Sequence, residues 1–300
     1  MEAGVDAVWL LQVGSAFLLN CGFSWLAGSW CARRWLPAGA GDPAGFDACM
    51  RVLDMLAAGV AIAAGGLSLL AATAVMGGTG LREACGMFWM MATTTAYGWS
   101  GCVAVAALAA VLALRSVRRR LPPAGELAVL LGMGVFAGTR SSMGHAGEQG
   151  LWSLPMAAES IHLSAISVWA GVVAVSGLLV LQVRWEMDAV NRYLNWMSHA
   201  ATAALAAIAI TGIYSGWHRV GSAGNLIYTV YGITLLSKVA LVLVAIGIGG
   251  YNKFIGLPAA SRSPDGVAVV RLALRIETVL LLGAILAAAM LTSQQPPTAI

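Results

Sequence analysis

A twenty-residue segment between two long apolar stretches gathers several side chains that could bind a metal. Residues 143–162 read MGHAGEQGLWSLPMAAESIH and hold two of the four histidines of the chain. The candidate ligands in this segment are Met143, His145, Met156, Glu159 and His162. Thioether ligands select Cu(I), and imidazole binds copper in either oxidation state. Zinc sites favour cysteine, histidine and carboxylate at closer and more regular spacing, so this set favours copper.

A second group of sulfur-containing side chains lies earlier in the chain. It consists of Met76, Cys85, Met87, Met90 and Met91. We expect Met87, Met90 and Met91 to face the same side of the membrane as the histidines and to contribute to one metal site. The alternative for each methionine is packing, because methionine fills irregular gaps between helices and the chain has 13 of them. The five cysteines form no CxxC pair, which argues against a disulfide framework and a zinc site.

The spacing of the later candidates predicts that they share one face of a helix. Steps of three and four residues return to the same helix face, and such steps connect Met156, Glu159, His162, Ile166 and Trp169. An ionisable residue within a membrane span is costly to place there, so His162 is a functional candidate. The alternative is a Glu159–His162 hydrogen bond that only stabilises the protein.

The composition indicates which elements must position these residues. Hydrophobic residues make up 59% of the chain and charged residues 10%, whereas a soluble domain carries about 25% charged residues. Helical spans of about 20 apolar residues satisfy their own backbone hydrogen bonds in lipid. The chain therefore reads as one all-α membrane domain over residues 1–300, a bundle of eight transmembrane helices. The expected spans lie near residues 6–32, 47–76, 86–114, 125–142, 155–182, 194–216, 227–250 and 268–291.

The distribution of basic residues predicts the orientation of the bundle. Alternate loops carry twelve and three Lys or Arg residues, and the loops rich in these residues face the cytoplasm. Both termini and residues 143–162 are then outside, on the periplasmic side of a bacterial membrane. The basic residues form short clusters and no continuous basic face, which argues against a nucleic-acid partner. The first apolar run lacks a basic leader and a cleavage site, and we expect it to remain as a span.

Two charged residues lie deep within expected spans. Lys238 and Glu277 are each about ten residues from the opposite ends of the last two spans, and a charge alone in hydrocarbon costs at least about 2.5 kcal/mol. We expect an ion pair between them, either as a structural salt bridge or as a charge relay. Arg51 and Asp54 are three residues apart and are expected to pair locally. His199, near the inner end of a span, is a weaker candidate.

Several segments resemble a known family of membrane proteins. MGHA (143–146) and IHLSAISVWAGVVAV (161–175) resemble the GHA…H…WxGG signature of the CopD family of copper-resistance and copper-uptake proteins. Residues 211–217, 231–253 and 275–297 resemble the last three spans of that family. One departure is Trp169-Ala170-Gly171-Val172, where the family has WxGG. The resemblance implies an eight-span inner-membrane protein that handles copper beside a periplasmic copper-binding protein of the CopC type, here a separate polypeptide.

These observations leave three classes of function open. The leading hypothesis is a copper-binding protein of the inner membrane that takes copper up from the periplasm and serves copper resistance, with lipid and the copper ion as its partners. A membrane redox protein would need two histidines at one depth to hold haem. A copper sensor or scaffold would use the same outer site without transport. The sequence has no P-loop and no arrangement of catalytic residues, so we expect no enzyme activity.

Overall fold

The computed structural model describes residues 7–36, 45–117, 121–144, 146–150 and 152–297, and these residues contain helices and no strand. Apolar stretches longer than 20 residues, bounded by glycine and proline, account for the long helices. The longer helices are α1 (Ala7–Trp35), α2 (Phe46–Gly77), α3 (Leu81–Thr94), α4 (Ala96–Val117), α5 (Pro123–Ser142), α6 (Leu154–Leu178), α7 (Met187–Val220), α9 (Val230–Tyr251) and α11 (Pro264–Thr292). Shorter elements are η2 (Gly147–Gln149), η3 (Val180–Gln182), α8 (Ala223–Tyr228), the π-helix η4 (Asn252–Gly256) and α10 (Leu257–Ala260).

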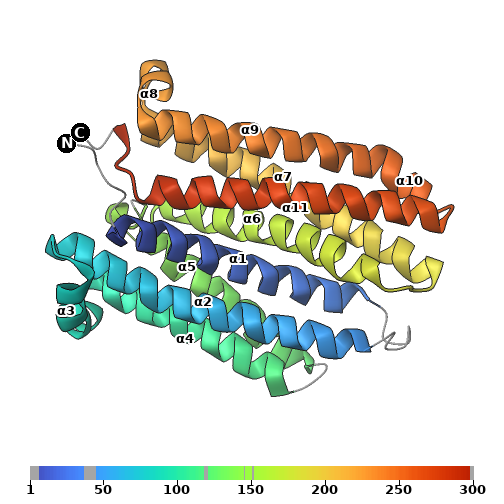
Figure 1. Ribbon diagram of the computed structural model, residues 1–300, viewed down its shortest axis with the longest axis horizontal. Coiled ribbons are helices and arrows are strands. Elements are labelled where there is room, and N and C mark those ends of the chain that lie inside the picture. Colours follow the sequence, from blue (N-terminus) through green and yellow to red (C-terminus); the bar gives the residue numbers. More distant parts are fainter. Residues whose placement is uncertain (1–6, 37–44, 118–120, 145, 151, 298–300) are drawn as a thin grey trace.

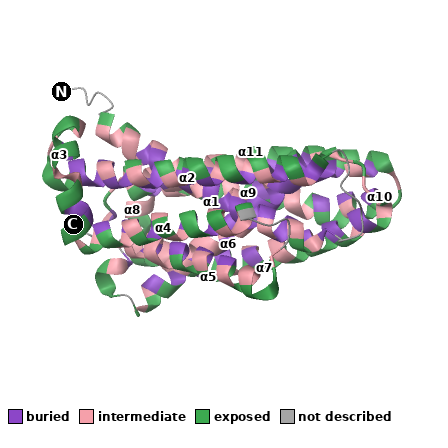
Figure 2. Ribbon diagram, turned by 90° about the horizontal axis from the view of Figure 1, so that it is seen from below, coloured by how far each residue is buried: buried purple, intermediate pink, exposed green. Residues whose placement is uncertain are grey.

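Seven of the described helices are long and apolar enough to cross a membrane. They are α1, α2, α4, α6, α7, α9 and α11, the sixth of these continuing through η4 and α10 to Ala260. Large apolar side chains on the outside of the bundle, such as Leu243, Ile213 and Val279, are 61%, 75% and 67% exposed, as lipid-facing residues would be (Figure 2). The chain is therefore a multi-pass membrane protein. α5 coincides with the fourth expected span in position but is not among the seven.

Two helices at the centre hold the two halves of the molecule together. α1 packs against α2 and α6, and α6 also packs against α5, α7 and α11. In Figure 1, α2 to α5 lie on one side of α1 and α6, and α7 to α11 lie on the other side. Gly28 of α1 and Gly171 of α6 face each other so closely that a Cβ on either would clash with the backbone of the other helix. Small residues allow this close approach of two helices. Gly171, which lies in the segment that departs from the WxGG pattern, therefore serves the packing of α6 against α1.

The expected single span 86–114 is wrong, because the chain breaks within it. Thr95 has extended dihedral angles (φ −107°, ψ 148°) and separates α3 from α4. The Thr95 hydroxyl accepts a hydrogen bond from the Gly98 N–H at 2.9 Å and so caps α4. α3 consequently lies across the ends of α2 and α4 (Figure 1).

The same break occurs in the second half of the molecule. Thr229 (φ −111°, ψ 151°) separates α8 from α9 and accepts a hydrogen bond from the Gly232 N–H at 3.0 Å. The sequences are Thr-Ala-Tyr-Gly at 95–98 and Thr-Val-Tyr-Gly at 229–232. At both glycines a Cβ would clash with the carbonyl end of the preceding short helix. A repeated Thr-x-Tyr-Gly motif therefore ends two short helices and begins two long ones.

Both breaks lie at the same end of the bundle, which we call the mouth end. It also carries the connection between α5 and α6, the start of α1 and the end of α11 (Figure 1). The indole N–H of Trp9 donates to the Ser293 hydroxyl at 3.1 Å and ties the first described helix to the last. We call the other end the far end.

Candidate functional site

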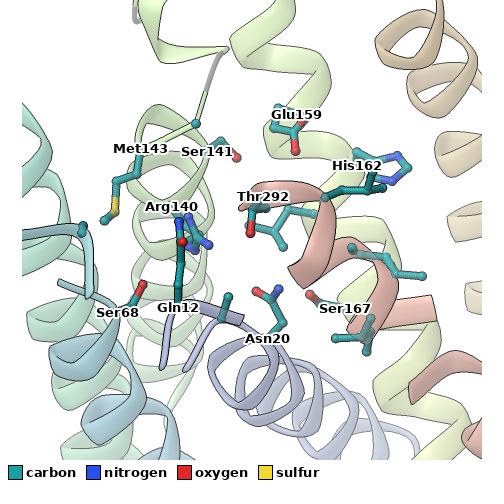
Figure 3. Close-up of a pocket in the computed structure, with 18 of the residues that line it drawn as sticks. Gln12, Asn20, Ser68, Arg140, Ser141, Met143, Glu159, His162, Ser167 and Thr292 are labelled. Atoms are coloured by element: carbon teal, nitrogen blue, oxygen red, sulfur yellow. The ribbon is translucent and has the colours of Figure 1, made fainter. Parts of the chain in front are cut away.

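A cavity of about 310 Å³ lies among α1, α2, α5, α6, α9 and α11 near the mouth end (Figure 3). We call it the vestibule. Four of the residues discussed for the metal site line it: Met76, Met143, Glu159 and His162. Lys238 lines it as well. The structure thus brings part of the expected site together around one cavity.

His162 is held in an orientation that leaves one ring nitrogen available. Its Nδ1 is 2.9 Å from the Thr211 hydroxyl, and that hydroxyl donates its own hydrogen to the Ala207 carbonyl at 2.6 Å. The Thr211 oxygen must therefore accept from Nδ1–H, which leaves the lone pair of Nε2 for a ligand. This is the arrangement by which a second residue fixes the tautomer of a metal-binding histidine. Figure 3 shows His162 on the side of the vestibule opposite Met143.

Glu159 is already engaged by a cation. Its carboxylate accepts a hydrogen bond from the Arg219 guanidinium at 2.6 Å, and both side chains are about half-buried. Arg219 also hydrogen-bonds Tyr231, and Lys238 has Glu159 and Arg219 as electrostatic neighbours. Glu159 therefore pairs with Arg219 and lies near Lys238, and the alternative Glu159–His162 hydrogen bond is not among those the structure shows.

The expected ion pair between Lys238 and Glu277 is not formed. The carboxylate of Glu277 is buried (2% exposed) and accepts a hydrogen bond from the Trp169 indole at 2.9 Å. It faces α9 at Gly249, where a Cβ would lie 3.4 Å from its Oε1. Gly249 is eleven residues from Lys238, which is about 16 Å along a helix at about 1.5 Å per residue. The two charges therefore lie at different depths, and the carboxylate that acts electrostatically on Lys238 is that of Glu159.

The methionines divide into those at the vestibule and those away from it. Met143 lines the vestibule and packs against the cluster that contains Met91. Met156 is buried and does not line the cavity. Met87 contacts the Gly77 region, and Met90 is 61% exposed on α3. Neither Met87 nor Met90 lines the vestibule.

The remaining histidines are placed as follows. His145 lies outside the described residues. His199 is exposed and contacts the Trp196 ring, and His218 packs on Tyr214. His218 is seven residues from Thr211 along α7 and His199 is twelve, so neither shares the depth of His162. The described histidines therefore offer no facing pair for haem, and they form no group of three with Cys, Asp or Glu.

Sequence reasoning missed several residues that line the vestibule. Tyr97 and Tyr231 come from the two Thr-x-Tyr-Gly breaks, so the repeat itself was the available signal. Gln12 and Asn20 are the amides of the first span, and polar residues there would have suggested an interior face. Arg140 served only as a topology marker in the sequence, yet it lines the cavity.

A second polar cluster lies near the far end. The carboxylate of Asp54 accepts hydrogen bonds from Arg33 at 3.0 Å, Arg115 at 2.9 Å and the Trp25 indole at 3.1 Å. Arg115 also donates to the Leu26 carbonyl at 2.9 Å. The expected local pairing of Asp54 with Arg51 is therefore wrong, because Asp54 faces α1 and α4.

Comparison with known proteins gives two family matches. Residues 187–291 match the family described as Copper resistance protein D, and residues 5–154 match the family described as Copper resistance protein D-like, N-terminal domain. The chain is similar to Copper resistance protein D of Pseudomonas syringae pv. tomato, with 27% identity over 204 residues. That alignment covers 65% of this chain and 65% of the relative's length. No solved structure matches the chain.

Proposed function

This chain belongs to the copper resistance protein D family, and we propose that its vestibule binds copper as cargo on its way across the inner membrane. The observation that carries the proposal is the sharing of one cavity by Met76, Met143 and His162. Thioether and imidazole are the ligands that suit Cu(I) in an oxidising compartment. The hydrogen bond between His162 Nδ1 and Thr211 supports Nε2 as the nitrogen that would bind the ion.

The proposal includes the topology. We take α5 as the eighth span, which places both termini and the mouth end in the periplasm, in agreement with the basic loops at the far end. Copper would enter the vestibule from the periplasm, delivered as the free ion or by a separate copper-binding protein of the CopC type. It would leave toward the cytoplasm, which makes the protein an uptake transporter with no enzymatic step.

The charge around the vestibule favours a monovalent cargo ion over a divalent one. Arg219 and Lys238 would repel a cation near His162, but Glu159 balances part of that charge. Cu(I) carries one charge, and soft ligands hold it by covalency more than by charge, so Met143 and His162 can bind it beside these residues.

The test is copper flux into liposomes under reducing conditions, with copper binding measured on the same protein. We expect His162→Ala to abolish most of the flux and to weaken binding at least about tenfold, the lower end of losses at metal sites. The matched control is His218→Ala. His218 lies in the last turn of α7, at the mouth end, and does not line the vestibule. Binding without flux in the unsubstituted protein would replace transport by a sensor or scaffold role. Flux that survives His162→Ala would remove His162 from the route.

A further inference from the structure

The vestibule contains a second group of polar atoms that copper binding does not use. Four buried side-chain atoms have no hydrogen-bond partner among the described residues, and their four residues all line this cavity. They are Asn20 Oδ1, Arg140 Nε, Ser141 Oγ and Ser167 Oγ. Buried polar atoms are nearly always paired, so four orphans around one cavity indicate a site for a polar ligand.

Arg140 differs from the other basic residues that lie inside the bundle. Arg33 and Arg115 are paired with Asp54, and Arg219 with Glu159. Arg140 has no ion pair with any carboxylate in the parts of the chain that the structure describes. The Arg140 Nε–H is buried without an acceptor, which is costly, and an anion in the vestibule would supply that acceptor.

The shape and chemistry of the cavity select the class of anion. A guanidinium presents two parallel N–H donors that match a carboxylate, and Ser141 adds a hydroxyl donor. Figure 3 shows Arg140, Gln12 and Asn20 directed into the cavity from α5 and α1. Ile285 and Ala288 of α11 add aliphatic surface to the lining of the cavity. About 310 Å³ is room for roughly ten water molecules at about 30 Å³ each, more than a halide fills.

We propose that the Arg140 side of the vestibule binds the carboxylate group of a small organic anion. One negative charge is favoured, because three basic residues and two acidic residues line the cavity and leave one positive charge uncompensated. The basic residues are Arg140, Arg219 and Lys238, and the acidic residues are Glu148 and Glu159. The carboxylate has two possible sources: a free aliphatic acid, or an amino-acid chelate that carries copper into the vestibule. The second source rests on the proposed function, whereas the first does not.

The test is saturation-transfer NMR of propionate with the protein in lipid nanodiscs. We expect a signal from the unsubstituted protein that falls at least fivefold in Arg140→Gln. The signal should partly recover in Arg140→Lys, which keeps the positive charge but lacks the two parallel N–H donors. Arg82→Gln is the matched control, since Arg82 is an exposed arginine of α3 at the mouth end. Asn20→Ala provides a second variant, and thermal unfolding of each variant checks that it folds.

A second arm separates the two sources of the carboxylate. Binding of Cu(II)–bis(glycinate) is compared with binding of Cu(I) supplied in acetonitrile, in the unsubstituted protein and in Arg140→Gln. Propionate binding that depends on Arg140 supports a free acid, and an Arg140-dependent affinity confined to the glycinate complex supports a chelate. No Arg140-dependent binding of either probe overturns the proposal. A protein that binds propionate but no copper refutes the proposed function and leaves the carboxylate site in place.

Discussion

The two polar clusters inside this membrane protein are built in opposite ways. At the far end, Asp54 is surrounded by donors, and Arg115 is only 7% exposed with its guanidinium fully engaged by Asp54, Ser29 and a backbone carbonyl. In the vestibule, Arg140 and three other residues keep unpaired polar atoms. Both clusters cost free energy to place in a bundle surrounded by lipid. The far-end cluster recovers most of that cost through hydrogen bonds and ion pairs within the chain, and among its described atoms Arg33 Nε is left without a partner. The vestibule leaves four such atoms, which a bound ligand would pair.

This difference separates a structural role from a binding role. A buried carboxylate that is paired with two arginines holds helices in place, here α1, α2 and α4. A cluster with orphan atoms beside a cavity is less stable alone and gains free energy when a ligand arrives. Substitutions at the far end should therefore change stability, and substitutions in the vestibule should change binding.

The largest expected effect is at Asp54. Asp54→Ala leaves Arg115 buried without its carboxylate, and breaking a buried pair in this way costs about 3–5 kcal/mol of unfolding free energy. Unfolding of the purified protein in mixed detergent measures the loss. Arg51→Ala is the control and should have little effect, because Arg51 is not among the partners of Asp54. Equal losses for the two variants would contradict the assignment.

The next effect concerns Trp169 and Glu277. Trp169→Phe removes the indole donor and leaves the Glu277 carboxylate buried without this bond, which costs about 1–3 kcal/mol. Adding Glu277→Leu removes the acceptor as well and should restore part of the stability. The double-mutant cycle is measured by the same unfolding assay. Additive losses would mean that the two side chains act independently.

The third effect tests how His162 is oriented. Thr211→Val keeps the shape of the side chain but removes the acceptor for Nδ1–H, and such supporting bonds change metal affinity by about 10–100-fold. We expect weaker Cu(I) binding in a competition titration with a chromogenic chelator. Thr139→Val, in α5, removes a comparable hydroxyl that bonds only its own helix and serves as the control. An unchanged affinity would argue against His162 Nε2 as a ligand.

A smaller effect distinguishes the two groups of methionines. Met143→Leu keeps the volume, so its stability cost stays below about 1.5 kcal/mol, while Cu(I) affinity falls several-fold through loss of the thioether. Met90→Leu, on the exposed face of α3, should change neither quantity. The same chelator competition compares the two variants. An equal loss of Cu(I) affinity in the two variants would indicate that α3 contributes to the metal site.

The smallest effect on stability is expected at the mouth end itself. The Glu159–Arg219 pair is about 30% exposed on either side, and pairs with such solvent access contribute about 0–1 kcal/mol. Arg219→Gln should therefore lower the unfolding free energy far less than Asp54→Ala. A loss as large as that of Asp54→Ala would mean that both ends are structural, and the contrast between them would disappear.

The sequence was sufficient for the long helices because apolar length alone dictates them. The expected spans near 6–32, 155–182 and 268–291 each coincide with a long helix, α1, α6 and α11. The break at Thr95 was not anticipated, because a hydropathy pattern does not register a threonine that caps a helix within an apolar stretch. The signal was present in the second copy of the motif at Thr229.

The periodicity of the sequence could not predict which side chains of different helices contact each other. Counting residues from the span ends put Lys238 and Glu277 at one depth, whereas Glu277 lies against Gly249, eleven residues from Lys238 along α9. Likewise, Asp54 has a basic residue three positions away and instead bonds Arg33 and Arg115 across helices. The stripe of α6 was correct in part: Glu159, His162 and Ile166 reach the vestibule, whereas Met156 does not.

The Thr-x-Tyr-Gly breaks also divide the chain into parts with different tolerance to change in length. Each threonine hydroxyl caps the helix that follows, so the bundle is complete without the short helix that precedes it. α3 has 14 residues and α8 has 6, yet Tyr97 and Tyr231 line the same cavity. Insertions and deletions among relatives should therefore accumulate ahead of these two threonines, where the architecture can diverge while the depth of both tyrosines stays constant.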